Sequence, residues 1–320
     1  MKSYVIGPLT AAIAAVASSV LAQQNTAESH ITAAKAAAGT DHVQLFEGTC
    51  LRDPGPPPER TEPRLVPERS SWYHEPVKVF DNLYYVGEKE YSAWAVSTSA
   101  GIILIDTIWS HSVEDEIVGG LRKLGFDPAN IKFALVSHAH IDHIGGAKYL
   151  QEKFGTRIVM SAADWDFAEQ TPRVPAEIKP KRDVVASDDY KLMLGDTTLS
   201  LYLTPGHTPG TISTIYTVKD GGRSHTVATW GGTGFNFELS PQTFQTYIES
   251  AVRYQGIVKQ AGADVLLSNH TRLDGSLDKF EALAKRKPGD PHPFVVGQQS
   301  VLRYVKVAEE CARAQLLKLK

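Results

Sequence analysis

The residues best suited to chemistry gather in one short stretch, VSHAHIDHIGG, at residues 136–146. Four side chains in six positions there can bind a metal ion: His138, His140, Asp142 and His143. Three of the chain's eleven histidines therefore lie together. The stretch follows the apolar run IKFALVS, which predicts a buried strand. Loops that follow such strands are where rigid scaffolds carry functional residues.

The spacing divides these side chains into two pairs. Residues two apart in an extended chain point the same way, so His138 and His140 can bind one ion together. Asp142 and His143 lie at the turn into the next helix and suit a second ion nearby. A solvated polar loop is the alternative interpretation, and the apolar strand that leads into the stretch argues against it.

Two more histidines follow hydrophobic strands, His207 in TLSLYLTPGHTPGT and His270 in DVLLSNHTRLDG. Three loops of this kind can converge at one edge of a sheet sandwich. The remaining histidines lie among polar, proline-rich or turn residues, and we expect surface or local hydrogen-bonding roles for them: His30, His42, His74, His111, His225 and His292.

The elements that position these loops alternate between strands and helices. Helices are predicted at 27–38, 112–125, 241–258 and 298–318, and hairpins around 195–196 and 219–222. Each half of the chain can bury one sheet under its own helices. The natural solution is an αββα sandwich, with two mixed β-sheets face to face and helices outside.

The N-terminal region predicts export. Residues 1–22 resemble a signal peptide, 23–75 a helix followed by a proline-rich arm, and 76–320 the domain that carries the candidate metal ligands. The apolar run at 5–17 is short for a bilayer span, so we expect a secreted or periplasmic protein without a membrane anchor. The alternative is the N-terminal helix of a cytosolic protein.

Charge and cysteine content narrow the function classes. The net charge is −3 and basic residues are scattered, so no nucleic-acid partner is expected, and a nuclease would need a basic groove. Only two cysteines occur, Cys50 and Cys311. They form either one bridge in an oxidising compartment or two independent buried thiols.

HxHxDH, a lone His in TPGHTPG and a late strand-terminal His together resemble the metallo-β-lactamase superfamily, over roughly residues 75 to 300. The resemblance implies an αββα sandwich with a dinuclear metal site at one sheet edge. It assigns one metal ion to His138, His140 and His207, and a second to Asp142, His143 and His270.

The chain departs from many members of that superfamily at one position. Those members bridge the two metals with an Asp about two dozen residues after the third histidine, where this chain has Gly231 and Gly232 in TWGGTG. With no cysteine there either, the ligands are only His and Asp. That set resembles the histidine-and-aspartate dizinc subclass of metallo-β-lactamases, as do AAKAAAGTDH and PHPFVVG.

Such ligands suit Zn²⁺, although iron or manganese also fits, and we expect two zinc ions per chain. Zinc lowers the pKa of a bound water to about 7, which provides hydroxide to attack a carbonyl. Asp142 is the expected catalytic residue, orienting that water and carrying its proton. We therefore expect a secreted hydrolase that opens a cyclic amide such as a β-lactam. The alternatives are a lactonase or other ester or amide hydrolase, an iron oxygenase of the same fold, and a binding protein.

For several residues around the predicted metal site, the sequence allows two roles. Asp106, which ends the apolar strand GIILID, either fixes a ligand imidazole or caps the turn at Thr107. Trp165, Phe167 and the loop 171–182 form either a lid or a solvated basic surface. The basic residues of that lid would meet a substrate carboxylate: Arg173, Lys179, Lys181 and Arg182. Residues 235–237 are expected to line the pocket floor, and the sequon at Asn269 is expected to be unmodified.

Overall fold

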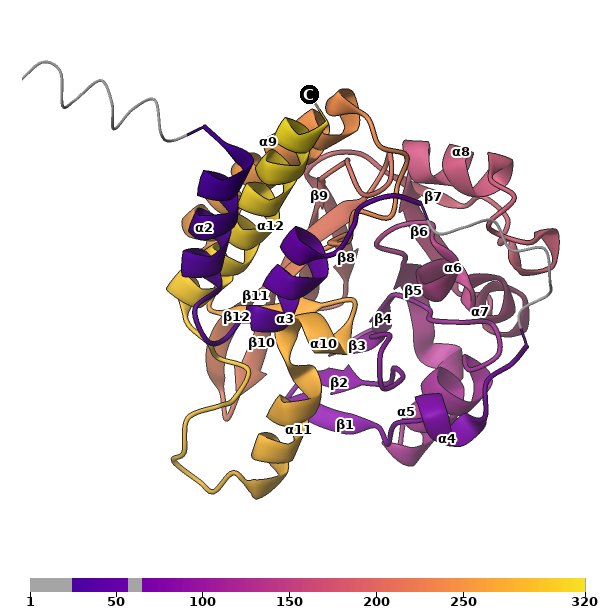
Figure 1. Cartoon of the computed structure of the whole chain (residues 1–320). Helices are drawn as coiled ribbons and strands as arrows, with labels where there is room; N and C mark the ends of the chain where they lie inside the picture. Colours follow the sequence, from indigo (N-terminus) through magenta and orange to yellow (C-terminus); the bar gives the residue numbers. More distant parts are fainter. Residues whose placement is uncertain (1–24, 57–64, 320) are drawn as a thin grey trace, which may run out of the picture.

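The computed structural model describes residues 25–56 and 65–319, and the predicted signal peptide at 1–22 lies outside them. Two β-sheets lie face to face, and helices cover both outer surfaces (Figure 1). The predicted αββα sandwich is confirmed. Because each sheet buries only one face against the other, its second face needs the helices.

The first sheet has seven strands in the order β1-β2-β3-β4-β5-β6-β7. Strands β1 to β4 are antiparallel neighbours, and β4 to β7 run parallel. Their bounds are Val77–Phe80, Leu83–Tyr85, Trp94–Thr98, Gly101–Ile105, Ile131–Leu135, Arg157–Ser161 and Val184–Ala186. The parallel half brings the carboxyl ends of β4 to β7 to one edge.

The second sheet has five strands in the order β12-β11-β10-β9-β8. Strands β8 to β11 are antiparallel, whereas β12 runs parallel to β11. Their bounds are Tyr190–Leu194, Thr197–Leu203, Ile212–Asp220, Arg223–Trp230 and, for β12, Val265–Ser268. Both predicted hairpins, β8–β9 and β10–β11, are present.

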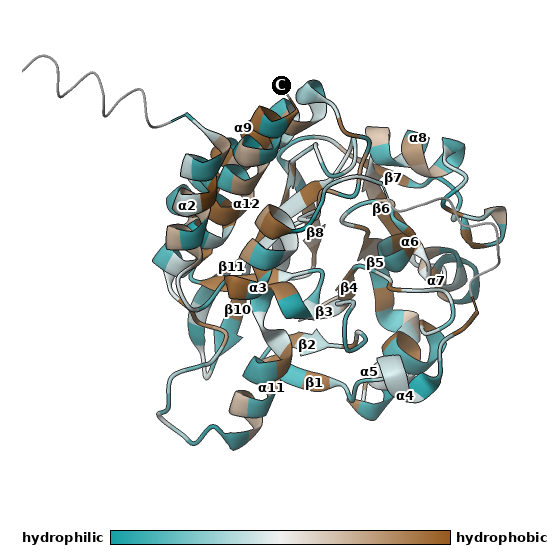
Figure 2. Cartoon of the chain, in the orientation of Figure 1, coloured by the Kyte–Doolittle hydropathy of each residue, from teal (hydrophilic) through white to brown (hydrophobic). Residues whose placement is uncertain are grey.

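Apolar residues fill the space between the sheets. Ile103 and Ile105 from β4 share one core cluster with Leu199 and Leu201 from β9, and all four are at most 2% exposed. Polar residues lie mainly on the outer faces of the helices (Figure 2). The alternate residues of β4, Ile102 and Leu104, belong to the core cluster on the other side of the sheet, so this strand is buried on both faces.

Three long helices cover the second sheet: α2 (Ala27–Ala38), α9 (Pro241–Ala261) and α12 (Gln298–Lys318). The first sheet carries α5 (Gly119–Lys123), α6 (Ile141–Ile144), α7 (Ala147–Phe154) and α8 (Ala162–Gln170). Shorter helical segments are α3 (Val43–Phe46), α4 (Arg69–Trp72), α10 (Thr271–Asp274), α11 (Ser276–Lys285), the π-helical η1 (Glu47–Leu51) and η2 (Glu114–Val118), and the 3-10 turns η3 (Pro128–Asn130) and η4 (Ala176–Ile178). No helix in the described ranges is both long and apolar enough to cross a membrane.

A disulfide joins Cys50 in η1 to Cys311 in α12, across a sequence separation of 261 residues. Of the two alternatives left open by the sequence, the bridge is therefore the one found. Beyond it the arm continues to Gly55, whose backbone N–H donates to the carbonyl of Phe235 at 2.7 Å. These two links attach residues 50–55 to α12 at one end and to the loop that follows β11 at the other.

Candidate metal centre

Three strands deliver all six predicted metal ligands to one edge of the sandwich. His138 follows β5, and His140 begins α6, which carries Asp142 and His143. His207 follows β9 and His270 follows β12. The side chains form two groups, His138 with His140 and His207, and Asp142 with His143 and His270. Within each group the ligand atoms lie within 4.8 Å of one another.

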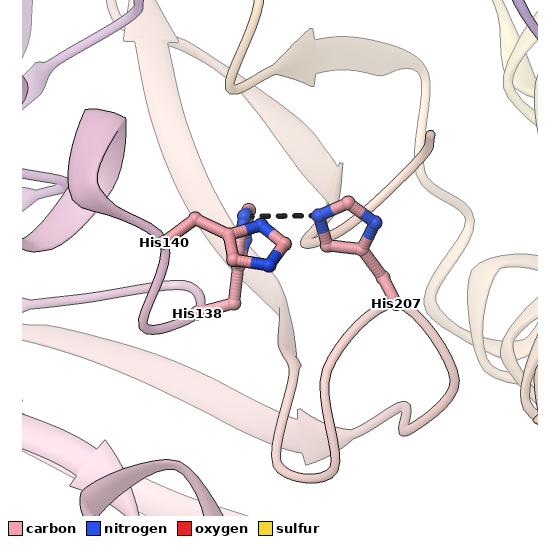
Figure 3. Close-up of side chains that lie close together, drawn as sticks. All are labelled: His138, His140 and His207. Carbon is pink, nitrogen blue, oxygen red and sulfur yellow. Dashed lines mark hydrogen bonds between the residues drawn. The ribbon is translucent and has the colours of Figure 1, made fainter. Parts of the chain in front are cut away.

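The three imidazoles of the first group point toward a common centre (Figure 3). Nε2 of His138 lies 3.0 Å from Nε2 of His207. The opposite nitrogens, Nδ1, donate to backbone carbonyls: His138 to Gly231 at 2.8 Å and His207 to Gly234 at 2.6 Å. Because a carbonyl only accepts, the proton of each ring is on Nδ1. The two facing Nε2 atoms are then unprotonated, and each directs a lone pair at the other.

This arrangement fits a cation. Burial holds the pKa of His138 and His207 well below its ordinary value, so both rings are neutral and their facing lone pairs repel each other. A metal ion between them removes the repulsion. Two nitrogens bound to one zinc at about 2.0–2.1 Å lie roughly 3.3 Å apart in a tetrahedral site, which is near the distance found. His140 is the third ring, and burial lowers its pKa to about 4.

In the second group, too, the candidate ligand atoms face one another. Oδ2 of Asp142 lies 3.4 Å from Nε2 of His143 and 3.8 Å from Nε2 of His270. Nε2 of His143 is buried and has no hydrogen-bond partner among the described residues. An orphaned buried nitrogen costs free energy unless something binds it, and a metal ion would. Burial raises the pKa of Asp142, but the imidazoles of His143, His270 and His140 outweigh it and hold that pKa below its ordinary value.

Carboxylates orient the two rings of this second group. Asp106 Oδ2 accepts from Nδ1 of His143 at 3.0 Å, and its Oδ1 accepts from the backbone of Ser137 at 2.7 Å. Of the two roles considered for Asp106, the structure shows the fixing of an imidazole. Glu90 accepts from Nδ1 of His270 at 3.2 Å. The sequence analysis missed Glu90, because nothing local distinguishes it from a surface acid.

The glycines at 231 and 232 fill the place of a bridging carboxylate. A Cβ on Gly231 would lie 1.9 Å from the carbonyl oxygen of Ile212, and one on Gly232 would lie 2.6 Å from the ring of His207. The backbone therefore runs too close to its neighbours for any side chain. Instead of a carboxylate, Gly231 presents its carbonyl oxygen to His138.

A second residue missed by the sequence analysis, Asp164 at the start of α8, joins the two loops of the first group. Its Oδ2 accepts from the backbone of Ala139 and the hydroxyl of Thr208, both at 2.9 Å. Its Oδ1 accepts from the backbone of Gly210 at 2.8 Å. Burial raises the pKa of this carboxyl to about 6, although these hydrogen bonds oppose the rise. Asp164 thus holds the loop of His138 and His140 against the loop of His207.

Two cavities open on the metal centre. One of about 490 Å³ is lined by His140 and His207 together with Phe167, Arg173 and Phe237. The other, of about 620 Å³, contains ligands of both groups. Asn236 and Phe235 line this second cavity, so the prediction that 235–237 line the pocket is confirmed.

The predicted lid is only partly present. Trp165 is 1% exposed and donates to the carbonyl of Val184, so it is a core residue and its assignment to the lid was wrong. Of the basic residues, Arg173 lines a cavity, whereas Lys179 donates to the backbone of Glu169 and Arg182 pairs with Asp166. The spacing of apolar residues along the chain does not distinguish an aromatic ring in the core from one that lines a cavity, and this explains the error.

The remaining histidines and the sequon play local roles. His42 and His292 are buried rather than superficial, and each bonds through Nε2 to a backbone carbonyl. Asn269 is 3% exposed and its amide donates to the carbonyl of Gly231 at 2.8 Å. A glycan needs this nitrogen free in solvent, which agrees with the expectation of an unmodified side chain.

Comparison with known proteins places this geometry in a family. The model of the metallo-β-lactamase superfamily matches residues 86–220. BJP-1, a subclass B3 metallo-β-lactamase of Bradyrhizobium japonicum, is 31% identical with a TM-score of 0.64, covering 74% of this chain and 91% of that one. The chain belongs to the metallo-β-lactamase superfamily. GOB-18 of Elizabethkingia meningoseptica is 26% identical with a TM-score of 0.61, covering 78% of this chain and 94% of that one.

Curated relatives match over a shorter segment. An N-acyl homoserine lactonase of a Bacillus species is 30% identical over 113 residues, which are 34% of this chain and 42% of the relative. The lactonase AttM of Agrobacterium fabrum is 32% identical over 118 residues, or 33% and 44% of the two chains. The chain therefore spans less than half the length of the curated relatives that it matches.

Proposed function

We propose that the protein is a metal-dependent hydrolase with two zinc ions that opens a cyclic amide of the β-lactam type. One observation carries the proposal: two groups of three candidate ligands, made only of His and Asp, lie at one edge, and five of these six residues line one cavity. The similarity to two metallo-β-lactamases, BJP-1 of subclass B3 and GOB-18, over more than nine-tenths of their length supports it. His138, His140 and His207 would hold one ion, and Asp142, His143 and His270 the other.

When bound, zinc supplies an activated water and a Lewis acid for the carbonyl oxygen. The chain's own residues do the rest. The carbonyls of Gly231 and Gly234 and the carboxylates of Asp106 and Glu90 hold Nδ1 of four ligand rings, so that each Nε2 faces the centre. Oδ2 of Asp142 faces Nε2 of His143 and of His270, and Asp142 lines the same cavity as the first group, where it would accept a proton from the attacking water.

A lactonase is the second candidate, favoured by the curated lactonase relatives. The experiment that tests both is metal analysis combined with hydrolysis assays on panels of β-lactams and lactones. We expect two zinc ions per chain and β-lactam opening that is lost when zinc is removed. Hydrolysis of lactones alone would replace the first proposal with the second, and one tightly bound iron would contradict both.

Export is also part of the proposal. A disulfide between Cys50 and Cys311 persists in oxidising compartments, which supports secretion or a periplasmic location. N-terminal sequencing of the mature protein tests it, with a start at Gln23 expected. An intact N-terminus in the cytosolic fraction would contradict it.

A further inference from the structure

The wall of the larger cavity comes from the N-terminal arm. Residues 48–49 and 52–56 line it together with His138, Asp142 and His270. The disulfide at Cys50 and the backbone hydrogen bond at Gly55 hold this arm segment near both ends. Pro54 and Pro56 limit its backbone further. The segment is therefore a fixed part of the cavity, although it lies more than eighty residues before the first metal ligand.

One arginine of this segment, Arg52, has no ionic partner among the described residues. Arg52 lines the cavity, is exposed and makes no ion pair or side-chain hydrogen bond with any described residue. Its neighbour Asp53 lines the same cavity and does not pair with it. Arg272, the other arginine of the cavity, is neutralised by Glu90, with Nε 2.9 Å from Oε1. Of the two arginines that line this cavity, Arg52 is thus the one without an ionic partner in the described part of the chain.

We propose that Arg52 determines specificity by binding a carboxylate of the substrate. This inference rests on the proposed hydrolase function and narrows its substrate class to cyclic amides that carry a carboxylate. A guanidinium presents two parallel N–H donors that match a carboxylate. The cavity that Arg52 lines contains members of both ligand groups, including His207 and Asp142. A substrate held there by its carboxylate therefore lies beside both groups.

The disulfide links this specificity to the redox state of the chain. Cys50 is two residues from Arg52, and its partner Cys311 lies in the long helix α12. Breaking the bridge frees the arm between α3 and Gly55. Recognition of the carboxylate should then weaken while the six metal ligands, which lie on other elements, stay in place.

The test compares one β-lactam as its free acid and as its methyl ester. The Arg52→Ala variant should lose about tenfold in kcat/KM on the acid, the lower end for a hydrogen bond to a charged group, and change less than twofold on the ester. Arg52→Lys should lose less. The control is Arg223→Ala, an exposed arginine in the β10–β11 hairpin that lines neither cavity. The double variant Cys50→Ser with Cys311→Ser should reproduce the loss on the acid.

A binding measurement separates this proposal from the proposed function. The ring-opened product of the same β-lactam, with its original carboxylate free or methylated, is titrated calorimetrically into the zinc-loaded protein. If the free acid binds more tightly than the methylated product and Arg52→Ala abolishes this difference, the role of Arg52 is supported. Failure of the enzyme to hydrolyse any β-lactam would overturn only the hydrolase assignment. A preference for the acid that survives in Arg52→Ala, or is absent from the wild type, overturns the proposed role of Arg52.

Discussion

Replacing Asp106 with Asn should weaken one metal site and spare the other. The carboxylate accepts three hydrogen bonds, from the backbone and hydroxyl of Ser137 at 2.7 and 2.9 Å and from Nδ1 of His143 at 3.0 Å. Asn offers one acceptor oxygen where Asp offers two. Its NH₂ group must therefore face either the backbone N–H of Ser137 or the Ser137 hydroxyl and Nδ1 of His143. The backbone φ of 62° at this position suits Asn, whereas Ala would add about 1–2 kcal/mol of strain.

The expected loss falls on the ligand that Asp106 orients. Without its acceptor, the His143 ring can rotate or move its proton to Nε2, the nitrogen that faces the second metal. Loss of such a partner typically lowers metal affinity 10–100-fold, or about 1.4–2.7 kcal/mol. His138 and His207 keep their carbonyl partners, so the first site should change less than threefold.

Zinc titration against a chelator of known affinity measures both sites. Asp274→Asn is the matched control, because Asp274 is a buried carboxylate that accepts from Ser268 and Ser276 and contacts no ligand. Equal losses at the two sites, or an unchanged second site in Asp106→Asn, would refute the reasoning.

Four further outcomes are expected. His140→Ala removes a ligand and should lower kcat more than about 100-fold, so activity within tenfold of wild type would contradict the site. Asp142→Asn keeps an oxygen but loses the proton acceptor, and kcat should fall at least about 100-fold at saturating zinc; full rescue by zinc would limit Asp142 to a ligand. Asp164→Asn should weaken the first zinc site about tenfold in the same chelator titration, with the second site unchanged. Burial raises the pKa of Glu116 to about 8 from 4.5, so its contribution to stability is full below about 4.5 and is lost as pH rises through 8. The free energy of unfolding of the wild type, measured by thermal unfolding, should therefore decrease relative to that of Glu116→Gln between pH 6 and 9, by a few kcal/mol at most. If the stabilities of the two proteins change in parallel with pH, the assignment is contradicted.

The sequence predicted which candidate ligands gather but missed the residues that support them, for a physical reason. His138, His140, Asp142 and His143 follow one buried strand, so local pattern alone places them together. The sandwich itself follows from strand and helix periodicity. Asp164, by contrast, acts through hydrogen bonds to loops 25 and 46 residues away. Such contacts depend on how elements meet in space, which spacing along the chain does not encode. The same holds for the disulfide, which the composition left open.

The close approach at Gly231 also bears on how this enzyme family can diversify. With Ile212 O only 1.9 Å from where a Cβ would lie, changing Gly231 to the bridging Asp of other members is blocked by the backbone. Because the clash is with the backbone of Ile212 in β10, it arises for every side chain, whatever that side chain would bind. The segment after β11 would have to move away from β10 before a carboxylate fits at this position. In this chain, the path of the backbone and a bridging carboxylate therefore exclude each other.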